Sequence, residues 1–379
     1  MKFYIRHQGI VILKDKIWHT EDNIEIEINE NQKDLLNFLE HKQLLENIKN
    51  KFSGIYTEKD IKEFIINNWI VEVSEENYHE FNQRGLFGAS IENFPYAINQ
   101  KPNFIVLGMP FDLNVSNRPG TRFAPDIIRQ NSKSIFNVNN VTQQGLWDPN
   151  VVNPQLINMK ILDIGNIKAN VFEQNGSHQN QLSYLTQKIL ESNIKPIVLG
   201  GDHSISYSTI NAVSQKHEKF GVIHIDAHSD FSGHAESTTT NGLHHGNFWD
   251  YLIENNNIKR VIQIGLRQLE YENIKHPKIE MYSSMEILKG NYPGDPDCNI
   301  PYYITFDIDV MDPSFISSVG TPVTGGLYYN DLVKLLDVLL KDLNVIGFDF
   351  VEYSPNNLMH EHIACSQIIY EIIRRIYND

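Results

Sequence analysis

Cysteine is almost absent from this sequence: Cys298 and Cys365 are the only two among 379 residues. So few thiols argue against a disulfide framework and predict a cytoplasmic location. No stretch reaches the ~18 uninterrupted apolar residues of a membrane helix. The first residues, MKFYIRHQGIVILKDK, also lack the apolar run and cleavage site of a signal peptide. We therefore expect no membrane partner.

Positive charge is also scarce. The chain has 32 Lys and Arg against 47 Asp and Glu, a formal net charge of −15. An acidic surface repels phosphate groups, which argues against nucleic acid as the main partner. The hydrophobic share of 41% and the charged share of 21% are typical of soluble globular proteins. The length allows more than one domain.

Residues 1–78 have the pattern of a small α+β unit. KFYIRHQGIVIL and IEIEI have strand character, three short apolar helices follow, and WIVEV at 69–73 closes the unit. The third helix has a predicted cap at Thr57, with Asp60 three residues later. This order resembles a winged-helix or PqqD-like unit, which holds leader peptides in ribosomal-peptide biosynthesis. A structural or oligomerising extension is the alternative. We expect a linker at 79–99 and a second domain at 100–379.

The second domain alternates apolar strand runs with helical segments. The runs are 104–110, 160–165, 196–201, 221–226, 261–266, 302–309 and 345–350. Near-continuous apolar strands separated by helices predict a mostly parallel sheet covered on both faces. Ligands of such sheets bind beyond the carboxyl ends of the strands. Reactive side chains at the carboxyl ends of these strands are therefore candidate site residues.

The stretch GVIHIDAHSDF at 221–231 begins as a buried strand and carries an ionisable residue at every second position. These residues are His224, Asp226, His228 and Asp230. Strand side chains alternate between the two faces, so the spacing predicts that all four point the same way. Unpaired buried charges are costly, which makes such a row unusual in a core.

Three more strand ends carry similar residues. GGDHS contains Asp202 and His203, TFDIDVMDP contains Asp307 and Asp309, and GFDFVEYSP ends with Asp349 and Glu352. A lone Asp-x-His-x-Asp is usually a solvated strand end, but here GGDHS, DAHSD and DIDVMDP each follow an apolar strand. Carboxylates clustered with imidazoles suit Mn, Zn, Fe or Ni. Six ligands exceed one tetrahedral centre and predict two metal ions that share carboxylates and activate a water molecule.

With these motifs the sequence resembles the arginase/agmatinase (ureohydrolase) family over roughly residues 100–375. The matching stretches are GMPFD, RPGTRFAP, GGDHS, IDAHSD, FDIDVMDP, GTPVTGGL and FVEYSP. The resemblance implies a three-layer α/β/α sandwich with two Mn²⁺ ions per chain. It implies hydrolysis of a guanidino group to urea and an amine. It also implies a homo-oligomer, a trimer or a hexamer.

The resemblance also implies roles for individual residues. One manganese ion would be bound by His203, Asp226, Asp230 and Asp307, and the other by His228, Asp226, Asp307 and Asp309. Glu352 would pair with the guanidinium, and Thr321 would lie near the substrate. His245 would relay protons to the departing amine, with the neighbouring His244 as the competing candidate. Asp230 would count among the catalytic residues as well as the ligands.

Other polar residues receive no ligand role. His224 stands where the family has no ligand and is expected to be an interior histidine. Asp202 and Asp349 are expected to accept hydrogen bonds behind the ligands. Cys365, in the apolar stretch ACSQIIYEII, is expected in the core.

The sequence departs from arginases that act on free arginine where those enzymes recognise the α-carbon substituents. Ser232 replaces an asparagine, and Gln268 and Glu270 replace aspartates. Ser232 and Glu270 are the candidate substrate contacts there. The departure favours a peptide arginase that converts arginine residues of a precursor peptide to ornithine. A small-substrate ureohydrolase, for free arginine, agmatine, guanidinobutyrate or guanidine, and an inactive scaffold are the alternatives.

Overall fold

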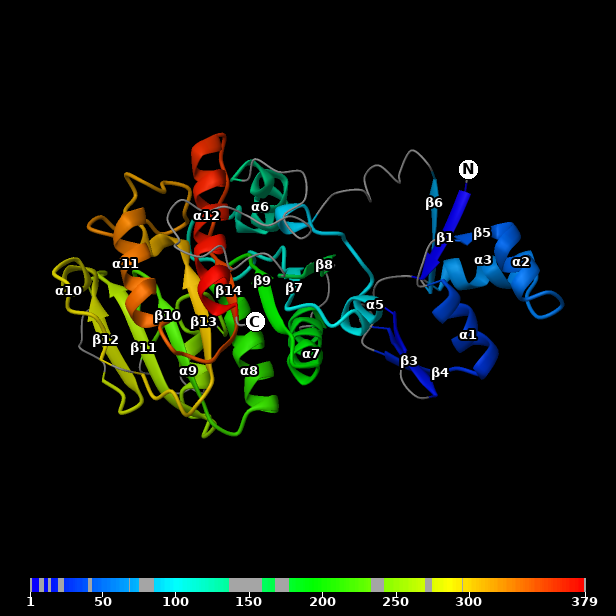
Figure 1. Ribbon diagram of the computed structural model, residues 1–379, viewed down its shortest axis with the longest axis horizontal. Helices are drawn as coiled ribbons and strands as arrows, with labels where there is room; N and C mark the ends of the chain where they lie inside the picture. Colours follow the sequence, from blue (N-terminus) through cyan, green and yellow to red (C-terminus); the bar gives the residue numbers. More distant parts are fainter. Residues whose placement is uncertain are drawn as a thin grey trace.

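The computed structural model describes twelve segments of the chain. They are 2–6, 10–12, 15–19, 24–39, 43–67, 69–74, 85–135, 159–167, 177–232, 242–269, 275–294 and 296–377. A large sheet flanked by helices makes up most of the molecule, and a smaller unit from the beginning of the chain lies at one end (Figure 1).

The large sheet has eight strands in the order β12-β11-β10-β13-β14-β9-β7-β8. All neighbouring pairs are parallel, as the apolar strand runs predict. The strands are β7 (Phe104–Gly108), β8 (Ile161–Asn166), β9 (Lys195–Leu199), β10 (Phe220–Ile225), β11 (Ile258–Leu266), β12 (Ile279–Ser283), β13 (Tyr302–Asp307) and β14 (Val345–Val351). All seven predicted strands are present. The eighth, β12, is an edge strand whose half-buried residues give no continuous apolar run.

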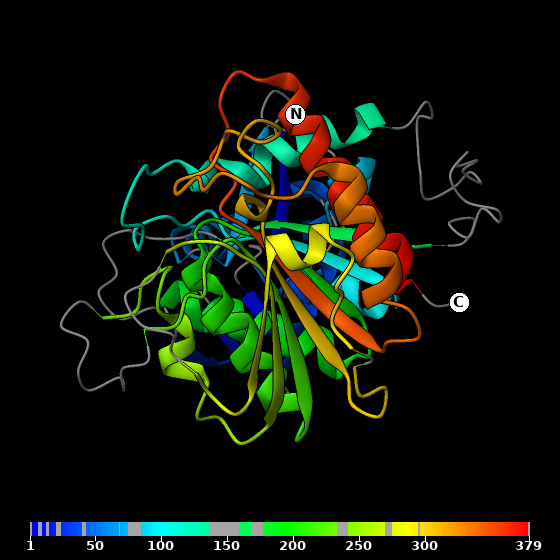
Figure 2. The same cartoon turned by 90° about the vertical axis from the view of Figure 1, so that its left-hand side faces the viewer.

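Helices cover both faces of this sheet, as Figure 2 shows for α11 and α12 (orange and red) opposite α8 (green). One face packs against α6 (Ala124–Ser132), α10 (Ser284–Leu288), α11 (Tyr329–Leu339) and α12 (Met359–Ile376). The other packs against α5 (Phe94–Asn99), α7 (Ser177–Glu191), α8 (Ser206–Lys216) and α9 (Phe248–Leu252). The three-layer α/β/α sandwich is confirmed. None of the helices in the described segments has the length and apolarity needed to cross a membrane.

The described residues of the N-terminal unit form two small antiparallel sheets and three helices. β1 (Lys2–Arg6) lies between β5 (Gln43–Leu44) and β6 (Ile70–Ser74), and β3 (Lys16–His19) lies between β2 (Ile10–Ile12) and β4 (Ile24–Glu27). The helices are α1 (Glu30–Phe38), α2 (Leu45–Lys51) and α3 (Glu58–Ile66). Thr57 and Asp60 cap α3 reciprocally, as predicted. The likeness to a winged-helix or PqqD-like unit stays a prediction.

Part of the segment expected to be a linker packs on the large sheet. Leu86 and Phe87, in the short helix η1 (Leu86–Gly88), belong to the hydrophobic core beneath α12. The Leu86 backbone N–H donates to the buried Asp163 carboxylate at 2.9 Å. We therefore propose that the catalytic unit begins at Gly85.

Candidate metal centre

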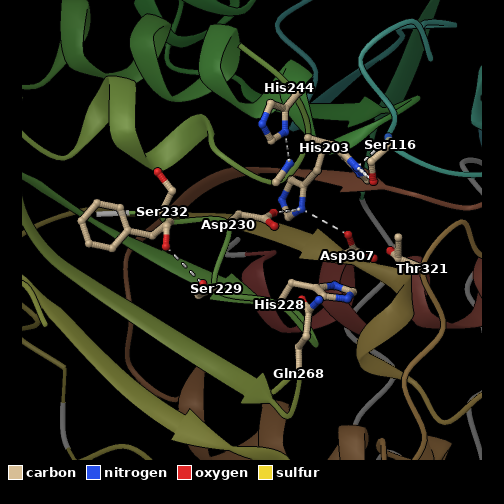
Figure 3. Close-up of a pocket in the computed structure, with 13 residues that line it drawn as sticks. Ser116, His203, His228, Ser229, Asp230, Ser232, His244, Gln268, Asp307 and Thr321 are labelled. Carbon is tan, nitrogen blue, oxygen red and sulfur yellow. Dashed lines mark hydrogen bonds and ion pairs between the residues drawn. The ribbon is translucent and has the colours of Figure 1, made fainter. Parts of the chain in front are cut away.

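Three strands of the large sheet, β9, β10 and β13, bring the predicted ligands together at their carboxyl ends, and β14 lies between β13 and β9. β10, β13, β14 and β9 are neighbours in that order. His203 lies in the short helix η4 (His203–Ile205) after β9, and Asp307 ends β13. Figure 3 shows His203 between Asp230 and Asp307, with His228 nearby. All six predicted ligands therefore meet at one place.

Strand alternation does not orient all four residues of the row His224, Asp226, His228 and Asp230. β10 ends at Ile225, so the expectation that a continuing strand orients His228 and Asp230 is wrong. Asp230 has φ 49°, a left-handed conformation that a non-glycine residue adopts only at some energetic cost. The predicted strand run 302–309 also includes Asp309, but β13 ends at Asp307 and Asp309 lies in the 3₁₀ turn η6 (Ile308–Val310). Bends in the loops, and not the pleat, point these side chains at the site.

The first group of candidate ligands surrounds one nitrogen of His203. Its Nδ1 lies 2.9 Å from Asp226 Oδ2, 3.0 Å from Asp230 Oδ2 and 3.1 Å from Asp307 Oδ2. In the described part of the chain this buried nitrogen nevertheless has no well-directed hydrogen bond. Three carboxylate oxygens gathered around an imidazole nitrogen that has no hydrogen-bond partner among the described residues suit a metal ion bound by all four atoms.

The opposite ring nitrogen sets the tautomer of His203. Nε2 lies 2.8 Å from the Thr305 hydroxyl, which itself donates to Asp349 Oδ1 at 2.6 Å. Because the Thr305 proton is engaged by the carboxylate, its oxygen accepts from His203 Nε2–H. The lone pair on Nδ1 is then free for a cation. Asp349 therefore accepts a hydrogen bond from Thr305, which in turn orients the candidate ligand His203, and this agrees with its predicted role as an acceptor.

The second group lies beside the first and shares Asp226 with it. His228 Nδ1 is 2.9 Å from Asp309 Oδ2 and 3.2 Å from Asp226 Oδ1. Asp226 thus offers Oδ2 to one group and Oδ1 to the other. The ligand atoms of Asp226, His228 and Asp309 lie within 4.8 Å of one another, and so do those of His203, Asp226 and Asp230 together with His224. This arrangement fits two cations bridged by a carboxylate.

The electrostatics of the cluster also fit cations. Burial, together with the charges of Asp309 and Asp226, raises the pKa of Asp307 well above its ordinary value. Burial and the charge of Asp226 raise the pKa of Asp309 as well. Burial alone would lower the pKa of His228, but Asp309 and Asp226 raise it to about 12. The carboxylates thus strongly favour positive charge at this place.

His224 belongs spatially to the first group, but its tautomer makes it a donor. The Trp249 indole N–H donates to His224 Nδ1 at 3.1 Å. Since an indole N–H can only donate, the ring proton of the neutral histidine is on Nε2, which lies 2.8 Å from Asp226 Oδ2. This tautomer makes His224 a donor that orients the Asp226 carboxylate, which favours the interior role expected from the sequence over a ligand role.

Glu352 and His245 lie next to the candidate ligands. Glu352, with φ 64°, accepts from the His203 backbone N–H at 2.8 Å through Oε1, which is also 3.1 Å from His245 Nδ1. Within the described residues the buried Oε2 has no hydrogen-bond partner. A buried carboxylate oxygen without a donor suits a guanidinium N–H. His244 makes no such contact, because its Nδ1 accepts from the Gly246 backbone.

A cavity of about 270 Å³ opens onto this cluster. Ser116 and Thr321 lie on one side of it and Ser232 on the other (Figure 3). Thr321 donates to Asp309 Oδ2 at 3.3 Å, which agrees with a place near the substrate. The Ser232 hydroxyl instead donates to the Asp250 carboxylate. Gln268 lines the cavity, and the predicted contact Glu270 lies outside the described residues.

The sequence analysis did not identify three residues that orient the histidines of the site. Ser116 contacts His245, and Trp249 and Thr305 set the tautomers of two histidines. Ser116 lies in the loop between GMPFD and RPGTRFAP, but nothing in that loop's sequence indicates which side chain turns inward.

Comparisons with known proteins agree with this geometry. Residues 102–374 match the model of the arginase family. The chain is 32% identical over 267 residues to mitochondrial agmatinase of Gallus gallus, covering 66% of this chain and 73% of that one. It is 31% identical over 280 residues to proclavaminate amidinohydrolase of Streptomyces clavuligerus, covering 70% and 83%. The solved structure of the proclavaminate amidino hydrolase superposes with a TM-score of 0.61, at 26% identity, over 73% of this chain and 92% of that one. The chain belongs to the arginase family, whose members are hydrolases of C–N bonds in linear amidines.

Proposed function

We propose that this protein is a ureohydrolase that binds two Mn²⁺ ions and hydrolyses a guanidino compound without a free α-amino acid end. The observation that carries the two-metal proposal is that Asp226 belongs to both ligand groups. The complete ligand set argues against the inactive scaffold. When bound, the two ions would turn a water molecule into a nucleophile near neutral pH and neutralise negative charge formed in the transition state.

The residues around the candidate ligands would bind the substrate and transfer protons. Glu352 Oε2 would accept a guanidinium N–H, which orients the substrate carbon toward the ligand cluster. Thr321, which lines the cavity, would limit the position of the substrate. His245 Nδ1, 3.1 Å from Glu352 Oε1, would hold the proton that the departing amine takes.

The residues that would recognise the substrate end opposite the guanidino group favour a substrate without an α-amino acid group. Ser232 is engaged by Asp250, and Gln268 stands where an acid would bind an α-ammonium group. The two α-charges of free arginine would be poorly paired in this site. Poor pairing of buried charges can lower kcat/KM by several powers of ten relative to a substrate that lacks them. Agmatinase of Gallus gallus and guanidinobutyrase of Pseudomonas aeruginosa, both relatives, are named for substrates without an α-amino acid group.

A peptide containing arginine is the second candidate. The folded N-terminal unit, with β6 at the edge of its sheet, is the observation in its favour, because an edge strand can pair with an extended peptide. The relatives give this candidate no support, and a small substrate fits at least as well. A cavity of about 270 Å³ accepts a small molecule or a single side chain.

Urea release from four compounds tests the proposal. The manganese-loaded protein would be assayed with agmatine, 4-guanidinobutyrate, free arginine and an arginine-containing peptide. We expect kcat/KM for agmatine or guanidinobutyrate to exceed that for free arginine by at least about 100-fold. Free arginine as the best substrate would contradict the proposal. A peptide as the best substrate would select the second candidate.

A further inference from the structure

Ser116 makes two contacts with one ring nitrogen of His245. The Ser116 backbone N–H donates to His245 Nε2 at 3.0 Å, and the Ser116 hydroxyl lies 2.8 Å from the same nitrogen. A backbone N–H can only donate, so Nε2 carries a lone pair and the ring proton is on Nδ1. That proton faces Glu352 Oε1 at 3.1 Å. The loop thus determines the tautomer of the histidine.

The position of Ser116 is defined although the residue is exposed. The Asn114 backbone N–H donates to Asp202 Oδ2 at 3.0 Å, and its carbonyl accepts from the His245 backbone at 3.1 Å. On the other side of Ser116, the Asn117 side chain donates to the Gly320 carbonyl at 3.1 Å. These contacts fix the loop on both sides of Ser116.

The two contacts differ in what they can do. His245 is only 8% exposed, whereas Ser116 is exposed, so the hydroxyl lies between the ring nitrogen and solvent. The backbone N–H favours only the unprotonated Nε2. The hydroxyl can donate to the lone pair and, after rotation, accept from a protonated Nε2. It therefore suits both protonation states of the ring.

We propose that the Ser116 hydroxyl relays protons between solvent and His245, an inference that rests on the proposed ureohydrolase function. The hydroxyl gives its proton to Nε2 while taking one from a water molecule, and Nδ1 then gives its proton to the departing amine nitrogen. When the next reacting water gives up a proton, Nδ1 takes it, and the Nε2 proton returns to solvent through the hydroxyl. One proton enters and one leaves in each cycle.

Several charged groups face His245. Glu352 is hydrogen-bonded to Nδ1, and Asp230 and Asp202 act through their charges. Burial lowers the pKa of His245, but these carboxylates outweigh it and raise the pKa above its ordinary value. The adjacent His244 has a lowered pKa, caused by burial and by His245. Removing the Ser116 hydroxyl removes an acceptor for protonated Nε2, so the pKa of His245 should fall.

The test compares three variants of the full-length, manganese-loaded enzyme. Ser116→Ala removes the hydroxyl and keeps the backbone N–H, and Ser116→Thr keeps both. Asn117→Ala is the matched control, since it loosens the same loop without touching His245. Metal content and thermal unfolding would be measured for each, so that only folded, loaded enzymes are compared.

We expect Ser116→Ala to lower kcat by about 10- to 100-fold, with KM within about twofold, since proton transfer contributes about 10²–10⁴-fold to catalysis. The basic limb of its kcat–pH profile should move to lower pH, and added imidazole buffer should restore part of the rate. Ser116→Thr should resemble the wild type. Asn117→Ala, which loosens the loop but keeps the hydroxyl, should lose less kcat than Ser116→Ala and should keep the basic limb in place. An unshifted pH profile in Ser116→Ala, or a loss insensitive to buffer, would overturn the relay.

A second measurement does not depend on turnover. Nitrogen-15 shifts of the His245 ring should show the Nδ1–H tautomer in the wild type, and a lower His245 pKa in Ser116→Ala. A proton found on Nε2 in the neutral ring would overturn the inference. Absence of urea release from every guanidino compound would instead contradict the proposed function and leave this ring measurement valid.

Discussion

At the scale of single residues, partners decide what each histidine of the site can do. His203 and His224 both lie within hydrogen-bond distance of Asp226 Oδ2. Thr305 leaves the His203 Nδ1 lone pair free, whereas Trp249 leaves His224 with a proton on the nitrogen that faces the carboxylate. The same residue type is therefore a candidate metal ligand at one position and a hydrogen-bond donor at the other.

The shared carboxylate leads to a prediction about metal content. Wild-type protein reconstituted with manganese should bind about two ions per chain. Asp309→Ala should lose chiefly one ion, whereas Asp226→Ala should weaken both sites, because its two oxygens serve both groups. Elemental analysis after removal of free metal measures this. Asp297→Ala, an exposed carboxylate outside the cluster, is the control and should bind two ions. One ion or none in the wild type would contradict the dinuclear centre.

Glu352→Gln should separate substrate binding from metal binding. The amide keeps the size of the side chain but gives a guanidinium a weaker, uncharged partner. We expect a loss of activity of about 100-fold or more, since a charge-assisted pair contributes several kcal/mol when buried, with metal content unchanged. Urea release and elemental analysis on the same preparation provide both readouts, and Glu254→Gln at the surface is the control. Loss of metal in Glu352→Gln would show that Glu352 also supports the ligands.

At the scale of elements, short turns after the strands place the ligands. The Gly-Gly bend after β9 brings Asp202 and His203 back over the sheet. A Cβ on Gly201 would lie 1.7 Å from the Phe111 carbonyl oxygen, so only glycine fits this close approach. The loop that carries Ser116 thus packs directly against the turn that carries His203.

Gly201→Ala should therefore damage both stability and the metal centre. We expect a loss of about 3 kcal/mol of unfolding free energy, at the upper end for overpacking a rigid site, together with weaker metal binding as His203 moves. Denaturant unfolding of the metal-free protein measures the first effect, and a metal titration measures the second. Gly294→Ala is the control, because nothing lies within 4 Å of its added Cβ. Equal stability of the two variants would contradict the steric role of Gly201.

At the scale of the whole molecule, the N-terminal unit has a core separate from that of the catalytic unit. Its buried residues run from Tyr4 to Ile70 and form their own cluster. The ligand groups all lie between His203 and Asp309. Burial, the charge of Glu191 and, to the smallest extent, the charge of Glu25 in β4 raise the pKa of Tyr184 in α7. A homo-oligomer and a cytoplasmic location stay predictions.

A chain that begins at Gly85 should keep the metal centre. We expect two bound ions and a kcat for a small guanidino substrate within about threefold of the full-length value, because no metal ligand is removed. If a peptide is the substrate, the truncation should raise its KM and affect kcat less. Elemental analysis, steady-state kinetics and the assembly state would be measured together. Loss of metal from a folded, truncated chain would contradict the independence of the two units.

The sequence by itself determined the chemistry and most of the framework. Seven strands are readable because strands buried on both faces must be continuously apolar. The six candidate ligands are readable because GGDHS, DAHSD and DIDVMDP each follow such a strand, and the family resemblance assigns the individual positions. Only the tertiary structure decided what depends on distant contacts. The edge strand β12 needs a neighbour to form, and the bends that aim His228 and Asp230 depend on packing. The proton positions on His203, His224 and His245 depend on Thr305, Trp249 and Ser116, which lie 25 to 129 residues away in the sequence and are brought near only by folding.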